Sequence, residues 1–450
     1  MKTKITVDNR ECGAGKTRGE FGNINRIKRL IALGERVILA VPSIAMFATY
    51  LDPIDGIPEL KSLNSVTEKN VQSSLHAAIS SGTQAIIITH TSLLMAQLTS
   101  QTRSLYHLIV DEKFEPWNEL SYKKDPLVPW SDIIGIDPDP VFTKWHRLHL
   151  SEDMREGDIT ETSPFLKSLY DANWCNYIHR ADYDRWLDDE ESKVNFIQEL
   201  TPSIFADWIS VHISAAAIEN TFLGWWMTRH GIDYQITHEF TRHTAPVTIH
   251  CMNIEKWSKG RRDKDSDIIS TFHDYIDAFP GEKLRLHNLD EQSILTGQEK
   301  LQHNTAGMNE YRGYKNVVLE SSLNPNNTSR DWYVQICLEY STDSLADAAY
   351  RFAKARTGYL FYQTLMRSCL RDGEPCDVFI IDRQTAESLI EYFDVLEYYH
   401  NPYIEIPYEA RPVNQGGRAF IGRSPEEVKA QAAARQKKYR ARQKEKKQQE

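Results

Sequence analysis

A short apolar run, Lys4-Ile-Thr-Val7, is followed after four residues by the glycine-rich stretch Cys12-Gly-Ala-Gly-Lys-Thr17. Small residues let successive backbone N–H groups converge on an anion, while the lysine can reach β and γ phosphates and the threonine hydroxyl a Mg²⁺ ion. The residues after Thr17 have helical spacing, so we expect the N-terminus of a helix to add its dipole. The position that normally holds the first glycine of this pattern is Arg10. We interpret six residues as a nucleotide-binding loop: Cys12, Gly13, Ala14, Gly15, Lys16 and Thr17.

The rest of the first hundred residues alternates between two kinds of pattern. Continuous apolar runs at 36–42, 84–90 and 105–111 are typical of strands that helices cover on both faces. Helical spacing separates them at 18–34 and 68–81. This alternation predicts a parallel α/β sheet.

The third of these runs ends in paired carboxylates, Leu108-Ile-Val-Asp-Glu112. ATP hydrolysis needs one carboxylate that holds Mg²⁺ and a second that orients and deprotonates the attacking water. We assign the first role to Asp111, together with Thr17, and the second to Glu112. The expected cofactors are therefore ATP and Mg²⁺.

The pattern changes after Glu112 and returns near Trp208. The intervening stretch has Pro-rich and acidic segments, and we expect a mostly helical insertion with a small core of its own. Apolar runs then resume at 208–214, 247–253, 316–321 and 376–382, which predicts a second α/β unit. Six of the ten tryptophans lie between Lys113 and Ser210: Trp117, Trp130, Trp145, Trp174, Trp186 and Trp208.

Charge is unevenly distributed along the chain. The whole sequence carries 53 Lys and Arg against 63 Asp and Glu, a net charge of −10. From Ile421 to Glu450 there are ten basic and four acidic residues, so this tail carries +6 and the other 420 residues carry −16. The tail suits neutralisation of phosphates, with Tyr439 available for stacking on a base. The alternative is a solubilising tail.

Cysteine spacing and hydropathy exclude several classes of protein. The six cysteines form no CxxC pair, which argues against a zinc site or a disulfide framework. The first residues have no apolar stretch typical of a secretory signal. The longest apolar run, Val37 to Leu51, is broken by Pro42 and is shorter than a membrane-spanning helix. We expect a cytoplasmic protein with no membrane partner.

Taken in order, these motifs resemble those of superfamily-2 DExx-box helicases and translocases, in a compact form that phages and mobile elements encode. The resemblance covers about residues 11–371. Its motifs are 11–17 (motif I), Val41-Pro-Ser43 (motif Ia), Thr89-His-Thr91, Asp111-Glu-Lys-Phe114 (the DExx box), Ile213-Ser-Ala-Ala216 (motif III), 307–318 (motif V) and 363–371 (motif VI).

The resemblance implies two RecA-like P-loop NTPase domains that close on ATP. The first would comprise residues 1–112 and 205–230, and the second residues 231–410. The Trp-rich insertion would occupy 113–204 and the basic tail 411–450. A protein partner could bind through the insertion.

It also implies roles for individual residues. Arg367 would be the arginine finger, with Arg371 as its substitute and Gln363 beside them in the catalytic site. Because these three residues are spaced four apart, we expect them on one face of a helix. Single-stranded nucleic acid would contact Pro42, Ser43, Thr89, His90 and Thr91. Coupling of hydrolysis to movement would involve Ser214, Ala215, Ala216, Gly307 and Asn309.

The chain departs from the family pattern at three points. Ala216 replaces a threonine of motif III, which weakens the expectation of strand separation. Arg371 follows Gln363 by eight residues where seven is common. Only ten residues precede motif I, too few for an upstream adenine-binding motif, so we expect weak base specificity.

The sequence thus favours an ATP-dependent motor on single-stranded nucleic acid, DNA rather than RNA, of the helicase or translocase kind. One alternative is a nucleic-acid-stimulated ATPase that remodels without separating strands. Another is a loader or scaffold that ATP switches and that binds a protein partner through the insertion. A small-molecule phosphotransferase would leave the motifs after residue 300 unexplained.

Overall fold

The structure, a computed structural model, describes most of the chain up to residue 408. The described residues are 3–54, 60–123, 133–139, 144–151, 169, 171–188, 193–252, 254–255, 257–258, 261, 266–286, 298–301, 311–321, 327–340, 344–395 and 403–408. Contacts divide the chain into two compact units, Met1–Pro407 and Tyr408–Glu450, and the described helices and strands all lie in the first. The basic tail expected at 411–450 lies outside the described residues.

The first sheet is parallel and has the strand order β12-β1-β11-β5-β2-β4-β3. The strands form at the apolar runs expected from the sequence, and every residue of β2 is buried, which is typical of a sheet covered on both faces. The strands are β1 (Lys4–Asp8), β2 (Val37–Val41), β3 (Leu60–Ser62), β4 (Ala85–Thr89), β5 (His107–Asp111), β11 (Ser210–Ser214) and β12 (Gln235–His238). Because β12 pairs with β1, this sheet extends past residue 230, where we expected the first domain to end.

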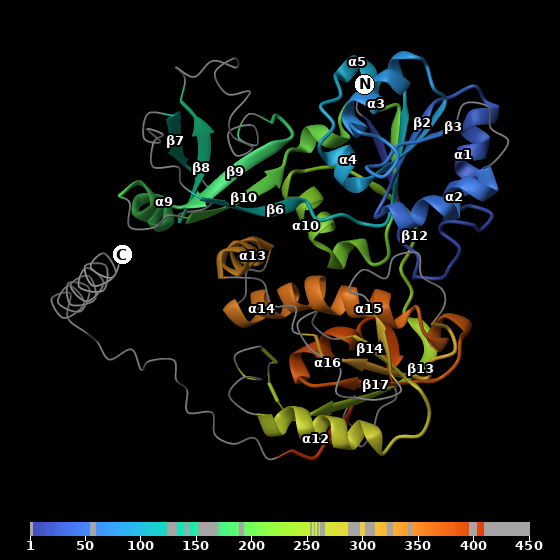
Figure 1. The fold of residues 1–450 in the computed structure, drawn as a ribbon, viewed down its shortest axis with the longest axis vertical. Coiled ribbons are helices and arrows are strands. Elements are labelled where there is room, and N and C mark those ends of the chain that lie inside the picture. Colours follow the sequence, from blue (N-terminus) through green and yellow to red (C-terminus); the bar gives the residue numbers. More distant parts are fainter. Residues whose placement is uncertain are drawn as a thin grey trace, which may run out of the picture. The chain divides into compact units, whose positions relative to one another are not determined.

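Helices cover both faces of this sheet (Figure 1). Alternate residues of β2 belong to different cores: Ile38 packs with residues of α3 and α4, whereas Leu39 packs with residues of α1 and α2. Asn70 caps α3 by accepting a hydrogen bond from the Ser73 backbone N–H at 3.0 Å. The helices are α1 (Asn23–Ala32), η1 (Ile44–Met46), α2 (Phe47–Ile54), α3 (Val71–Ser80), α4 (His90–Leu94), α5 (Ser100–Arg103), η2 (Pro202–Phe205), η3 (Ile218–Asn220) and α10 (Phe222–Arg229).

The expectation of a mostly helical insertion is wrong, because its described residues form an antiparallel sheet with the order β6-β10-β9-β8-β7. Aromatic and β-branched residues alternate between the two faces of its strands, with Phe196 on one face and Ile197 on the other. The expected separate core exists on the face covered by α9. The elements are β6 (Trp117–Lys123), β7 (Ile134–Pro138), β8 (Trp145–Leu150), β9 (Trp174–His179), α9 (Arg180–Leu187) and β10 (Lys193–Leu200).

The second parallel sheet has the order β15-β14-β16-β17-β13-β18, and β19 also pairs with β13. Its strands are β13 (His243–Met252), β14 (Lys283–Leu286), β15 (Gln298–Leu301), β16 (Asn316–Leu319), β17 (Cys376–Ile380), β18 (Phe393–Val395) and β19 (Ile404–Ile406). The helices of this half are α12 (Ser266–Asp277), α13 (Asn327–Tyr340), α14 (Leu345–Ala353), α15 (Tyr359–Leu365), η5 (Cys369–Asp372) and α16 (Arg383–Ile390). The described residues therefore have the expected α/β fold with two parallel sheets. No helix among them is long and apolar enough to cross a membrane.

Helix α13 follows the second sheet's strand β16 in sequence but packs against the insertion and the first core. Trp332 is fully buried, with its ring centroid 4.8 Å from that of Tyr177 and 5.2 Å from that of Trp145. Tyr333 stacks on Phe222 of α10 at 5.0 Å. These aromatic contacts join three parts of the chain that are distant in sequence.

We therefore predict that Trp332→Ala destabilises the protein by about 3–5 kcal/mol, because it leaves a large cavity between α13 and the antiparallel sheet. Leu338→Ala on the same helix is the control, since Leu338 is 36% exposed. Urea denaturation followed by circular dichroism measures both. An equal effect of the two substitutions would contradict the proposed packing.

Candidate nucleotide site

The glycine-rich loop leaves the carboxyl end of β1 and makes two tight turns before α1. Gly13 and Gly15 have φ angles of 92° and 80°, which residues with a Cβ rarely adopt. The N–H of Gly19 donates to the Gly15 carbonyl at 2.7 Å, and the N–H of Asn23 donates to the Lys16 carbonyl at 2.8 Å. Helix α1 begins at Asn23 and not directly after Thr17. The expectation that the loop opens straight into this helix is therefore wrong, because the residues between Arg18 and Gly22 form an extra turn.

Arg10, at the position of the missing glycine, ties the loop to its strand. Its Nε donates to Asp8 Oδ1 at 2.8 Å, its second nitrogen pairs with Asp8 Oδ2, and its third donates to the Ala14 carbonyl at 3.2 Å. Burial would raise the pKa of Asp8, but the hydrogen bonds and charge of Arg10 outweigh it and lower this pKa. Arg10 thus stabilises the loop by linking Ala14 to Asp8 at the end of β1.

Lys16 lies in the loop and is only 7% exposed. Its Nζ donates to the backbone carbonyls of Arg10 and Glu11 at 2.8 and 3.0 Å. The ammonium group therefore closes the loop on itself, and an anion in the loop would replace these neutral acceptors with charged ones.

Asp111 lies at the carboxyl end of β5 and is buried beside the loop. Asn23 donates to Asp111 Oδ1 at 3.0 Å and accepts a hydrogen bond from Ser214 Oγ at 2.9 Å. Asp111 Oδ2 is buried and has no hydrogen-bond partner in the described part of the chain. Burial, and then the charge of Glu112, raise the pKa of Asp111 to about 7. A dication beside this carboxylate would offset both effects. Thr17 lines the same cavity, and a carboxylate oxygen together with a hydroxyl suits Mg²⁺.

Glu112 has a backbone conformation that is unusual for its residue type. Its φ is 66°, in the left-handed region, and its N–H donates to the Ser214 carbonyl at 2.8 Å. Such a conformation costs about 1–3 kcal/mol and persists where the surroundings enforce it. Its Oε2 accepts hydrogen bonds from Gln363 Nε2 at 2.8 Å and from the Tyr359 hydroxyl at 3.3 Å.

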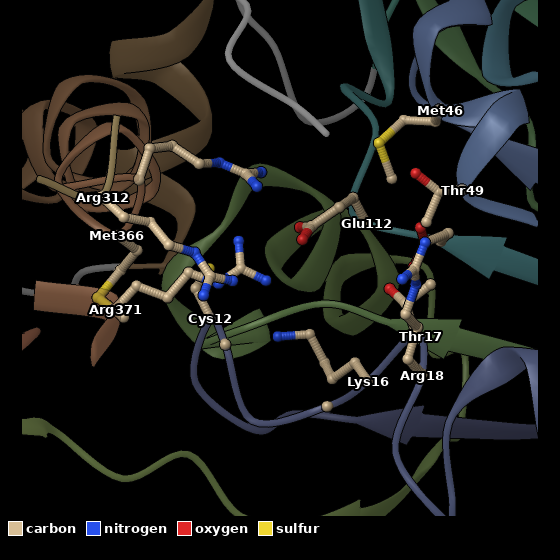
Figure 2. A pocket seen from close by; sticks show the side chains of 14 residues that line it. Cys12, Lys16, Thr17, Arg18, Met46, Thr49, Glu112, Arg312, Met366 and Arg371 are labelled. Carbon is tan, nitrogen blue, oxygen red and sulfur yellow. The ribbon is translucent and has the colours of Figure 1, made fainter. Parts of the chain in front are cut away.

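These groups surround a cavity of about 220 Å³, in which the loop, Asp111 and Glu112 lie together with Arg312, Arg367 and Arg371. Figure 2 shows Glu112, Lys16, Arg312 and Arg371 pointing toward this space. Burial lowers the pKa of Arg371, as do the positive charges of Arg367 and Arg312. Arg312 also pairs with Asp372 at 3.2 Å. The gathering of three guanidinium groups at one cavity nevertheless favours an anionic ligand. The lining residues are Cys12, Gly13, Gly15, Lys16, Thr17, Arg18, Met46, Thr49, Asp111, Glu112, Arg312, Met366, Arg367 and Arg371.

Gln363, Arg367 and Arg371 do not share a helix face, so that expectation is wrong. Helix α15 ends at Leu365, Arg367 lies in the following turn, and Arg371 lies in the 3₁₀ helix η5. The Ser368 side chain accepts a hydrogen bond from the Leu370 N–H and caps η5, which begins as a separate turn after α15. All three side chains nevertheless reach the cavity or Glu112.

Tertiary contacts also add residues that the sequence did not single out. Asn23 bonds Asp111, Tyr359 bonds Glu112, and the Tyr362 hydroxyl accepts a hydrogen bond from the Cys12 N–H at 2.7 Å. Arg312 lies within the stretch 307–318 that resembles motif V. Its positive charge in that stretch was the one sequence signal that could have indicated a place at the cavity. Gly307 and Asn309 of the same stretch lie outside the described residues.

The segments expected to contact nucleic acid follow two neighbouring strands. Val41 of β2 is the register partner of Thr89 of β4, so Pro42 and Ser43 follow the end of one strand and Thr91, which is exposed, follows the end of its neighbour. The Thr89 hydroxyl caps α4 by accepting from the Ser92 N–H at 3.2 Å.

His90 is a different case, and a nucleic-acid contact through its side chain is the wrong expectation. The side chain is 7% exposed, and its Nε2 lies 2.9 Å from the Asp111 carbonyl oxygen. Burial lowers the pKa of His90 to about 4. A neutral, buried imidazole here links α4 to β5.

The segment that resembles motif III connects the two cores. The N–H of Ala215 donates to the Asp8 carbonyl at 3.1 Å, and Ala215 packs in the first core. Ala216 and Ala217 are buried in the core of the second sheet. Ala217 has a φ of 46°, so the chain turns sharply as it passes from one core to the other.

Comparison with known proteins adds likenesses of fold. The sequence matches no protein-family model and no curated protein. Solved structures that are similar in fold include three that cover most of this chain, and this likeness concerns the fold alone. They are "Structure of S. tokodaii Xpd4" (10% identity, TM-score 0.49, 90% of this chain and 96% of that chain covered), "XPD_APO" (9%, 0.46, 90% and 96%) and "XPD_Helicase" (10%, 0.44, 88% and 96%).

Among the described residues, no group of three or more His, Cys, Asp and Glu side chains is arranged to hold a metal ion.

The Asp8–Arg10 pair gives a stability prediction. Arg10→Ala removes the main partner of a carboxylate that is 2% exposed and leaves only longer contacts at 3.5 Å, from His238 Nδ1 and the residue 10 backbone N–H, so we expect a loss of about 3 kcal/mol at pH 7. Because the folded-state pKa of Asp8 is lowered, the contribution of the pair is present above the unfolded pKa of about 3.9. It is lost as the pH falls through the lower folded-state pKa, so the difference between wild type and variant narrows below about pH 4.

Denaturant titrations at several pH values measure this difference. Arg180→Ala is the matched control, since Arg180 pairs with Asp184 at the surface with both side chains about half exposed and contributes about 0–1 kcal/mol. A pH-independent difference for Arg10→Ala would contradict the ion pair.

Proposed function

We propose that this chain is an ATP-dependent nucleic-acid motor that couples hydrolysis to movement along single-stranded nucleic acid. One observation carries the proposal. A glycine-rich loop and two carboxylates at the edge of the first sheet share a cavity with three arginines from the half of the chain that contains the second sheet. This arrangement suits a nucleoside triphosphate held between the two sheets.

The loop would bind the phosphates of ATP. Gly13 and Gly15 supply N–H groups in the left-handed conformations that a phosphate cradle needs. Lys16 would exchange its two carbonyl acceptors for phosphate oxygens. Thr17 and the unpaired oxygen of Asp111 would hold Mg²⁺, which neutralises charge on the phosphates when bound.

Glu112 would take the proton of the attacking water. Gln363 and Tyr359 both donate to Glu112 Oε2, Gln363 at 2.8 Å. Neither hydrogen bond involves Oε1, the oxygen that would accept the proton. Arg367 and Arg371 would stabilise the charge that develops on the γ phosphate. Their mutual repulsion in the cavity would fall when the phosphate is bound, so binding and closure support each other.

Movement would be coupled to this site by the segment 214–217. Ser214 bonds Asn23, which bonds Asp111, while Ala216 and Ala217 lie in the core of the second sheet. A shift between the two cores would therefore reach the metal-binding carboxylate. The strand would lie along Pro42, Ser43 and Thr91, whose backbone and hydroxyl groups suit sequence-independent phosphate contacts. We favour DNA over RNA on the resemblance alone.

A second candidate is a nucleic-acid-stimulated ATPase that remodels its substrate without separating strands. The specific observation is Ala216, which is fully buried and carries no hydroxyl that could bond across the two halves. A hydrogen bond between the hydrolysis site and the second core is then unavailable from this position.

The catalytic assignment predicts two distinct losses. Glu112→Gln should lower ATP turnover by about 100-fold or more while nucleotide binding remains, because it removes only the base. Lys16→Ala should lose both ATP turnover and nucleotide binding. Glu35→Gln is the control, since Glu35 is half exposed and lies before the amino end of β2. Steady-state hydrolysis and equilibrium ATP binding measure these effects, and full turnover by Glu112→Gln would refute its role.

The motor assignment predicts that single-stranded DNA stimulates hydrolysis and that stimulation weakens with salt, because phosphate contacts release counterions. Hydrolysis should be titrated with single-stranded DNA, single-stranded RNA and duplex over a salt series, beside strand displacement on tailed duplexes. Hydrolysis without displacement favours the remodelling ATPase. If none of the three nucleic acids stimulates hydrolysis, the chain is not such a motor.

A further inference from the structure

Tyr359 lies at the first position of α15 and contacts the carboxylate of Glu112, a residue that lines the cavity. Its hydroxyl donates to Glu112 Oε2 at 3.3 Å and accepts a hydrogen bond from Gln363 Nε2 at 3.1 Å. Tyr359 and Gln363 are four residues apart and so stand on the same face of one helical turn. Together they give Glu112 two donors on a single oxygen, a more restrictive arrangement than one donor provides.

The ring of Tyr359 is also held by the DExx segment. Lys113 Nζ lies 4.8 Å from the centroid of this ring, within the range of a cation–π contact. Adjacent residues of the DExx segment, Glu112 and Lys113, therefore engage the hydroxyl and the ring face of one tyrosine. Tyr359 is 1% exposed, and burial together with the charge of Glu112 raises its pKa well above its usual range, so the phenol stays a neutral donor.

The register of the helix determines where Tyr359 points. Lys354–Gly358 form a π-helical turn between α14 and α15, with helical backbone angles on both sides. Such a turn adds one residue and rotates the next helical residues by about 100° relative to a regular α-helix. Gly358 permits close packing of this turn against α16, because a Cβ there would lie 2.9 Å from Ser388 Oγ.

The same turn marks the passage between the two cores. Phe352 and Ala355 pack in the first core, whereas Tyr359 and Tyr362 pack in the second. Residues 345–365 thus form one helical segment anchored in both halves, with the contact to Glu112 placed directly after its irregular turn. A relative movement of the cores would act on Glu112 through this segment.

We propose that Tyr359 is a positioning residue for Glu112, whose hydroxyl, together with Gln363, holds one carboxylate oxygen so that the other meets the attacking water. This inference rests on the proposed ATPase function. It adds a contact within the same site, from α15 to the water-activating carboxylate at the end of β5.

The test compares two tyrosines on this segment. Tyr359→Phe removes the hydroxyl but keeps the ring and its contact with Lys113. Tyr350→Phe is the matched control, because the Tyr350 hydroxyl donates to the Glu391 carboxylate at 2.8 Å, and Glu391 is not among the residues that line the cavity. Steady-state hydrolysis by the full chain gives kcat and KM for ATP, and thermal denaturation gives Tm.

We expect Tyr359→Phe to lower kcat about tenfold or more, with KM within about twofold and Tm close to that of Tyr350→Phe. Tyr350→Phe should leave kcat and KM within about twofold of wild type. Equal kcat values for the two variants would overturn the inference. So would a loss that comes with a raised KM and a lowered Tm, since that is the signature of a merely structural role.

The outcome for the wild type separates this inference from the function on which it rests. Hydrolysis that depends on Lys16 but not on the Tyr359 hydroxyl would overturn the inference alone. Absence of Lys16-dependent hydrolysis in the wild type would overturn the proposed function, and the positioning role with it.

Discussion

The hydrogen bonds that Gln363 and Tyr359 make to the Glu112 carboxylate determine the geometry of the candidate site. Glu112 stands at the end of β5 in a left-handed conformation, and its side chain meets α15 across the cavity. Because both donors come from one helical turn, the carboxylate is oriented by the half of the chain that also carries Arg367 and Arg371. The loop on one side and the arginines on the other then face a common space.

The packing of α13 and of the segment from α14 to α15 makes the contact between α15 and Glu112 possible. Trp332 and Tyr333 anchor α13 between the antiparallel sheet and α10, so a helix that follows the second sheet in sequence belongs to the first core. The segment from α14 to α15 then runs from the first core to the second. The segment 214–217 also passes from the first core into the second, and the chain returns to the first core at Ile218. Two buried segments therefore contact both of the halves that would move during a hydrolysis cycle.

Much of the site was predictable because its chemistry is local in sequence. The loop residues, Asp111 and Glu112 lie at the ends of apolar strands, and the ends of neighbouring parallel strands meet at one edge of a sheet. Asn23 and Tyr359 were not predictable, since a buried amide and a buried phenol leave no pattern that distinguishes them from ordinary core residues. His90 shows the converse error: a polar residue after a strand reads as a contact for a ligand, although its imidazole bonds the backbone of β5.

The sequence alone determined the two parallel sheets, since continuous apolar runs separated by amphipathic stretches have few other ways to bury both faces of each strand. It also indicated the glycine-rich loop that we propose binds phosphate, because the small residues Gly13 and Gly15, followed by Lys16 and Thr17, form a pattern that is local in sequence. The tertiary structure decided the rest. The antiparallel sheet of the insertion, the passage of α13 into the first core and the approach of Tyr359 to Glu112 depend on contacts between residues as many as 251 positions apart. Such contacts follow from complementary packing, which no local pattern encodes.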